Sequence, residues 1–167
     1  MNKTIYFGLL FVFLVFLQVF VLNNMLFLGY VNPYLYIIFV FLYPLKKSRF
    51  TFLLLSFLLG LSIDFFSDSG GIHAFSILTI AYLRLFFIKV FFRKYEIDYP
   101  FFSLNLEPFG KSFNYVVTLT VIHHFILFSL INFSFQNISH VILNTLYSSV
   151  FTLVLYFLSV YIFSKKQ

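Results

Sequence analysis

The stretch GLSIDFFSDSGGIHAFSILTIAYLR, residues 60–84, places two acids, three glycines, a histidine and an arginine inside a strongly apolar region of the chain. Apolar runs on either side of a short polar turn predict two membrane-crossing helices joined as a hairpin. Ser69, Gly70 and Gly71 are residue types that relieve the backbone where a short turn reverses direction. The stretch therefore predicts a helical hairpin, and its polar residues need an explanation of their own.

The composition of the whole chain predicts an integral membrane protein. Its 167 residues are 62% hydrophobic and 10% charged, with a mean hydropathy of +1.00, which excludes an ordinary soluble fold. Residues 4–45 and 112–164 contain no Asp, Glu, Lys or Arg, and each run is long enough for two crossings of about 20 residues. The absence of cysteine excludes disulfides, thiolate metal sites and cysteine nucleophiles. We expect a single all-α transmembrane domain over residues 1–167.

The apolar runs and their breaks predict a bundle of six transmembrane helices. Asn32 and Pro33 have the pattern of an N-cap followed by proline at the first helical position, so a helix is expected to begin there and to continue to residue 45. Such a helix spans only about 20 Å, so we expect this second crossing to be short, tilted or completed by residues 25–31. The six predicted helices cover residues 5–22, 33–45, 50–66, 72–92, 112–133 and 139–163.

The basic residues predict the orientation of this bundle. In a six-crossing arrangement all the basic loop and terminal residues fall on one side, whereas the opposite connections, 23–32, 67–71 and 134–138, contain no Lys or Arg. The positive-inside rule then places both termini in the cytoplasm. The net charge of +6 is thus interpreted as an orientation signal and not as a nucleic-acid-binding surface. The basic residues on this side are Lys3, Lys46, Lys47, Arg49, Arg93, Lys94, Lys111, Lys165 and Lys166.

Asp64 lies where the apolar run before the turn has not yet ended, and an ionisable residue at that depth usually faces a protein interior. Its nearest candidate partners are the backbone N–H groups and side chains of residues 71–74, including His73, where the positive end of the helix dipole favours a carboxylate. We therefore expect Asp64 to lock the hairpin; direct ligand binding or proton carriage is the alternative. Asp68 is interpreted as a solvated turn residue.

Arg84 is a charged residue deeper in the fourth predicted helix, about 18 Å of helix rise from its outer end. Asp64 lies close to that outer end, so the two side chains do not meet easily in a straight hairpin. We expect Arg84 to extend toward the cytoplasmic interface, as Lys89 does, or to bond polar groups of a neighbouring helix. Gly60, four residues before Asp64, is a candidate point of close helix packing.

His123 and His124 fall near the middle of the fifth predicted helix, and adjacent helical positions point about 100° apart. A proton relay or metal ligation is one interpretation. Interhelical hydrogen bonds to partners such as Gln18 or Asn144 are favoured over it.

The sequence shows no catalytic constellation. His73 and His140 are expected near the outer surface, but they lack the carboxylate or thiolate pattern of a metal site. No nucleophile triad, His-Glu-x-x-His helix or phosphate-binding loop appears, so we expect no enzyme activity, metal or cofactor. The polar connection over residues 93–111 is either a membrane-surface linker or a surface for a cytoplasmic partner, and the sequence leaves both open.

Several polar and small residues now form a recognisable pattern: Asn32, Pro33, Tyr43, Pro44, Gly60, Leu61, Asp64, Gly71, His73, Ala74, Ala81, Tyr82 and Arg84. This pattern resembles that of the MreD family, the rod-shape-determining membrane proteins of bacteria. Length, helix number and inward-facing termini agree with the family, whereas residues beyond 84 match it only as apolar spans.

The resemblance implies a non-catalytic role in the bacterial cytoplasmic membrane. Members of this family belong to the elongation machinery that guides lateral peptidoglycan synthesis, with a single-span MreC scaffold as partner. The wider assembly contains an MreB filament, the RodA glycosyltransferase and its transpeptidase. The family's fold is similar to the six-helix substrate-binding subunits of energy-coupling-factor vitamin transporters. The residues around Asp64, Gly71, His73 and Arg84 would then shape the bundle core and the surface offered to a partner helix.

Two other functions remain open at this level. The shared six-helix layout is compatible with a vitamin-type substrate-binding subunit of a transporter, which would hold a small ligand in an outer cavity. A membrane-embedded hydrolase or transferase that uses His123 and His124 is the least favoured of the three.

Overall fold

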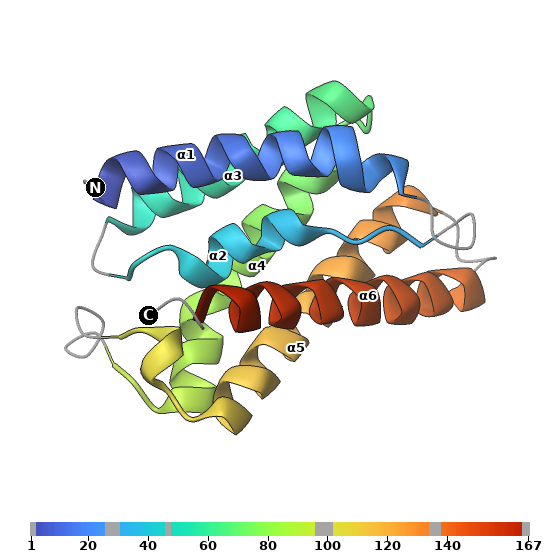
Figure 1. Ribbon diagram of the computed structural model, residues 1–167. Helices are drawn as coiled ribbons and strands as arrows, with labels where there is room; N and C mark the ends of the chain where they lie inside the picture. Colours follow the sequence, from blue (N-terminus) through green and yellow to red (C-terminus); the bar gives the residue numbers. More distant parts are fainter. Residues whose placement is uncertain (1–2, 26–30, 46–47, 96–101, 134–137, 165–167) are drawn as a thin grey trace.

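The computed structural model describes residues 3–25, 31–45, 48–95, 102–133 and 138–164. The elements in these ranges are helices, and the long ones lie side by side in one bundle (Figure 1). Within the described ranges, five helices are long and apolar enough to cross a membrane. The chain is therefore a helical, multi-pass membrane protein, as its composition predicts. The five candidate spans are Ile5–Asn24, Arg49–Ser67, Ile72–Phe92, Phe109–Ile131 and Ile138–Ile162.

The first span changes its helix type along its length. α1 (Lys3–Phe16) continues into the π-helical turn η1 (Leu17–Val21) and then into the 3₁₀ turn η2 (Leu22–Asn24). Most of the span presents apolar side chains to its surroundings, but Gln18 in η1 is fully buried. Single π-turns in α-helices frequently occur where a side chain has a special task, and here the turn carries the fully buried amide of Gln18.

Segment 31–45 is not the regular helix that the sequence predicts. Its helical part is the 3₁₀ turn η3 (Leu35–Ile37) followed by the short α2 (Ile38–Leu42), with non-helical backbone on both sides. Asn32 and Pro33 therefore do not open the helix. Non-helical residues can advance up to about 3.3 Å each against 1.5 Å in an α-helix, so the segment can reach farther than the about 22 Å of a regular helix of the same length. In Figure 1 it runs along the bundle between its two ends.

The remaining spans form a continuous antiparallel series. The turn between α3 and α4 is tight, with left-handed backbone at Asp68 (φ 51°), Gly70 (φ 66°) and Gly71 (φ 94°), where glycine is the favoured residue type. The start of α1 and the end of α6 lie at the same end of the bundle (Figure 1). The elements are α3 (Arg49–Ser67), α4 (Ile72–Phe92), the 3₁₀ turn η5 (Leu104–Leu106), α5 (Phe109–Ile131) and α6 (Ile138–Ser164).

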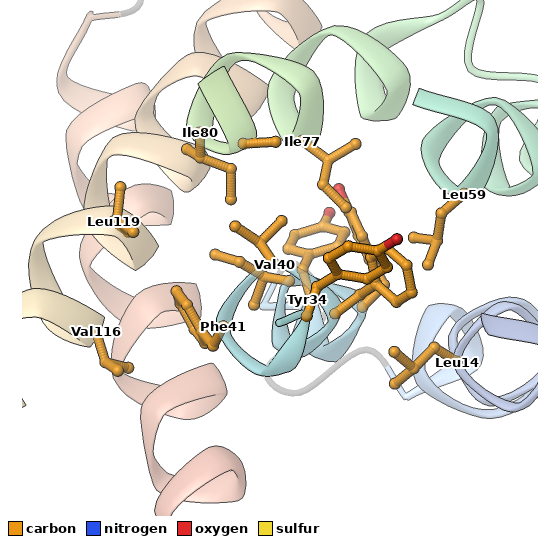
Figure 2. Packing of buried hydrophobic residues seen from close by; sticks show 14 of the residues in the cluster. Leu14, Tyr34, Val40, Phe41, Leu59, Ile77, Ile80, Val116 and Leu119 are labelled. Atoms are coloured by element: carbon orange, nitrogen blue, oxygen red, sulfur yellow. The ribbon is translucent and has the colours of Figure 1, made fainter. Parts of the chain in front are cut away.

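Segment 31–45 occupies the middle of the bundle. Lipid is as apolar as the side chains in this core, so helix association in a membrane depends on close packing and on interhelical hydrogen bonds. The polar partners of the segment therefore hold it in place. Figure 2 shows how apolar side chains of the segment pack against those of the surrounding helices. Tyr34, Val40 and Phe41 belong to the segment, and the labelled residues around them are Ile77 and Ile80 of α4, Val116 and Leu119 of α5, Leu59 of α3 and Leu14 of α1.

Candidate functional site

Asp64 locks the α3–α4 hairpin in the way that the sequence predicts. Its buried carboxylate accepts hydrogen bonds from the backbone N–H of His73 at 3.0 Å and of Ala74 at 2.8 Å. These N–H groups belong to the first turn of α4 and have no partner within the helix. Ser69 in the turn also donates its hydroxyl hydrogen to the carboxylate. One acid from α3 thus caps the next helix, whereas Asp68 is an exposed turn residue, as expected.

Gly60 lets α3 and α4 approach closely beside this cap. A Cβ atom built on Gly60 would lie 2.5 Å from the Cα atom of Ala74 and 2.7 Å from the carbonyl oxygen of His73. Both contacts are with backbone, which cannot move aside like a flexible side chain. The predicted packing point is therefore confirmed, and it places Asp64 within reach of the α4 backbone.

Arg84 bonds the backbone of segment 31–45. Its Nη2 donates to the carbonyl oxygen of Tyr43 at 2.5 Å and lies 3.5 Å from that of Phe41, at the end of α2. The guanidinium also lies over the Phe52 ring, 4.9 Å from its centroid. Arg84 is only 2% exposed, so it does not extend to the cytoplasmic interface. The alternative expectation, a bond to a neighbouring element, is confirmed, and Asp64 and Arg84 bind separate groups.

Gln18 and Thr152 bond the other end of segment 31–45. The Gln18 amide donates to the Pro33 carbonyl oxygen at 3.0 Å and accepts from the Leu35 N–H at 3.1 Å. Thr152 of α6 accepts a bond from the Tyr34 N–H at 3.0 Å. Non-helical backbone is tolerated at membrane depth only where protein groups satisfy it. Sequence reasoning missed both roles; a lone glutamine in a long apolar run was the available signal for the first.

Tyr36 connects two histidines in the centre of the bundle. Its hydroxyl lies 2.9 Å from Nδ1 of His73 and 2.8 Å from Nε2 of His123. A hydroxyl can donate only one hydrogen, so it donates to one ring and accepts from the other. His73 is the second residue of α4, and its side chain is buried inside the bundle.

His124 belongs to the same interior. Its Nδ1 lies 2.8 Å from the carbonyl oxygen of Thr120, which can only accept, so this nitrogen carries a hydrogen. Its Nε2 lies 3.0 Å from the Thr152 hydroxyl, which also lies 2.8 Å from the Ser148 carbonyl oxygen. By rotating its single hydrogen, that hydroxyl can serve either a neutral or a protonated ring without moving a heavy atom.

The two adjacent histidines form interhelical bonds, as favoured from the sequence, but with different partners. Tyr36 and Thr152 take the places that were expected for Gln18 and Asn144. Both rings also pack around Tyr34, at centroid distances of 6.3 Å and 5.4 Å. Adjacent positions on a helix point in different directions, but the Tyr34 ring is large enough to contact both histidine rings. Among the described residues, no group of three or more His, Asp or Glu side chains is placed to hold a metal ion.

Of the remaining predicted site residues, Tyr82 and Gly71 lie apart from this interior. Tyr82 is 61% exposed on α4, and the guanidinium of Arg49 lies 5.2 Å from its ring centroid. Gly71 is the residue before α4, and its backbone has the left-handed conformation. Asn32 has a buried side-chain oxygen with no hydrogen-bond partner in the described structure.

These features define a class: a multi-pass helical membrane protein with one discontinuous segment that side chains of neighbouring helices hold in the bundle interior. Comparisons of the chain with protein-family models, with curated proteins and with solved structures find no match.

Proposed function

We propose that this protein is a non-catalytic scaffold of the bacterial cell-elongation complex, in the cytoplasmic membrane. In this role it helps to control rod shape and lateral peptidoglycan synthesis through an MreC-like single-span partner. The MreB-like filament, the RodA-like glycosyltransferase and the elongation transpeptidase are further members of that assembly. The proposal starts from the resemblance of the hairpin sequence to the MreD family.

One structural observation supports a scaffold over a catalyst. The two buried charged residues of the hairpin bond to backbone: Asp64 caps α4, and Arg84 bonds the Tyr43 carbonyl oxygen just after α2. Groups used in this way fix the relative positions of helices, which is what a scaffold that presents a surface to a partner requires. Most of the outer surface is apolar, and Tyr82 with Arg49 forms an exposed pair on the α3–α4 face.

Depletion in a rod-shaped host tests the proposal. We expect cells to become round and the protein to copurify with an MreC-like partner. Asp64→Asn should weaken this copurification, whereas Asp68→Asn, a matched change in the same turn, should leave it unchanged. Normal rod growth after complete loss of the protein would contradict the proposal.

The discontinuous segment favours one second candidate, a vitamin-type substrate-binding subunit of a transporter. Interrupted helices near the membrane midplane often mark ligand sites in transporters. In this chain the buried rings of Tyr34 and Tyr36 fill the space beside the interrupted backbone. Native mass spectrometry separates the two candidates, because a tightly bound small molecule that survives purification supports the transporter subunit and argues against a pure scaffold.

A further inference from the structure

A cleft of about 550 Å³ opens on the flank of the bundle between α1 and α3. Its floor is formed by Phe39 and Tyr43 of segment 31–45, and its walls are otherwise mostly apolar. Gly8 in α1 faces open space, because a Cβ atom added there would meet no heavy atom within 4 Å. The lining residues are Phe7, Gly8, Phe11, Phe39, Tyr43, Ser48, Thr51, Leu55 and Leu58.

The length of the cleft limits what it can hold. On α3 its lining begins at Ser48, beside the first residue of the helix, and ends at Leu58 near the helix middle. Ten residues of helix rise about 15 Å, which is half of the roughly 30 Å hydrocarbon core. A spanning helix of a partner needs the full thickness. One acyl chain of a lipid, which extends from the interface to the midplane, matches half of it.

The lining of the cleft changes from polar to apolar along this length, as the chemistry of a lipid does. Ser48 and Thr51 bring hydroxyl groups to its interfacial end, whereas Leu55, Leu58 and Phe11 line its deep end. A glycerolipid has this order, with ester and headgroup oxygens at the interface and methylene groups below them.

The charges at the interfacial end favour an anionic headgroup. α3 begins at Arg49, one residue after the lining residue Ser48, and the sequence contains no Asp or Glu before Asp64. The Arg49 guanidinium lies 5.2 Å from the Tyr82 ring centroid, outside the lining of the cleft, so it acts on a headgroup here through its charge and not through a direct contact. Ser48 makes no capping bond with its side chain, so the first N–H groups of α3 and its positive dipole end add to this field. Each basic residue near a membrane surface attracts anionic lipid by about 1 kcal/mol.

We propose that the cleft between α1 and α3 binds one acyl chain of an anionic phospholipid, with the headgroup at Ser48 and Thr51. By the positive-inside rule the lipid belongs to the cytoplasmic leaflet. The bound chain lies against the flank of segment 31–45 that faces α1, where Tyr43 contacts Phe7 with ring centroids 5.2 Å apart. The inference does not depend on a role in cell elongation.

Photocrosslinking of the full chain in phosphatidylcholine nanodiscs that contain some phosphatidylglycerol tests the site. Two phosphatidylglycerol probes carry a diazirine either near the ester or near the terminal methyl of one acyl chain. We expect the first to label residues 48–51 and the second to label residues 55–58 and Phe11. The same probes built on phosphatidylcholine should label these positions roughly fivefold less for each basic residue that contributes.

Two variants with matched controls sharpen the result. Gly8→Leu fills the cleft and should reduce its labelling to the level of the lipid-exposed face, whereas Gly110→Leu, which also enters open space but at the start of α5, should not. Arg49→Gln should reduce the preference for phosphatidylglycerol about fivefold, and Arg49→Lys should keep it. The depth profile of the wild-type protein decides the question even if Gly8→Leu does not fold.

Three outcomes would overturn the proposal. The first is equal labelling by the phosphatidylcholine and phosphatidylglycerol probes, and the second is unchanged labelling in Gly8→Leu. The third is protection of the cleft by a second copy of the chain, which would appear as loss of lipid adducts at these positions in nanodiscs that hold two copies and their return in nanodiscs that hold one.

Discussion

Replacement of Asp64 by asparagine, which exchanges one carboxylate oxygen for an NH2 group, should weaken the α3–α4 hairpin. The carboxylate accepts two backbone bonds, from His73 and Ala74, with its two oxygens. Asparagine keeps only one oxygen, so one buried N–H faces an amide that also donates, at a cost of about 1–3 kcal/mol. Loss of the negative charge at the start of α4 adds about 0.3–1 kcal/mol. The expected loss of unfolding free energy is therefore about 1–4 kcal/mol, and Asp64→Ala, which leaves both N–H groups without an acceptor, should cost more, about 2–7 kcal/mol.

Equilibrium unfolding in mixed micelles of a mild detergent and dodecyl sulfate, followed by far-ultraviolet circular dichroism, measures these differences. Asp68→Asn is the matched control, because Asp68 is exposed and its left-handed backbone suits asparagine, so its effect should stay within about 0.5 kcal/mol. The cap would be refuted by an Asp64→Asn protein as stable as the control. Equal losses in Asp64→Asn and Asp64→Ala would show that charge, and not the number of acceptors, is the main contribution.

Three further substitutions test other contacts of the interior by the same unfolding assay. Gly60→Ala should cost about 1–3 kcal/mol because the new methyl overlaps α4 backbone, whereas Gly110→Ala, in open space, should not destabilise; similar small effects in both would reject the close approach. Tyr36→Phe should cost about 1–3 kcal/mol, because it leaves two histidine nitrogens without their shared partner; wild-type stability would contradict this. Arg84→Met should preferentially speed hydrogen exchange in residues 31–45, and a uniform change over all helices would count against a specific hold on that segment.

The sequence predicted the hairpin well because its determinants are local. Asp64 and the residues it caps are ten or fewer positions apart, and the turn residues between them allow few arrangements. Gly60 follows from the same geometry, since it lies one helical turn before Asp64. Apolar length alone predicted the five long spans.

Segment 31–45 could not be predicted in the same way. Asn32 and Pro33 have a genuine local helix-start pattern, but the backbone beside them is satisfied by side chains from distant parts of the chain. Gln18 and Thr152 are 17 and 118 residues from the groups they bond. No local pattern specifies such partners. The prediction that His123 and His124 form interhelical bonds was correct. Their partners, Tyr36 and Thr152, were not predicted, because they too are distant in the sequence.

The bond between the Tyr34 N–H and Thr152 has a consequence for how the chain is made. Its two residues are 118 positions apart, so at roughly 5–20 residues per second the second is synthesised about 6–24 s after the first. Throughout that interval the non-helical backbone of the segment lacks one of its acceptors, and bare lipid cannot supply it. The early part of the chain must therefore wait, beside the insertion machinery or partly hydrated, until its last helix arrives.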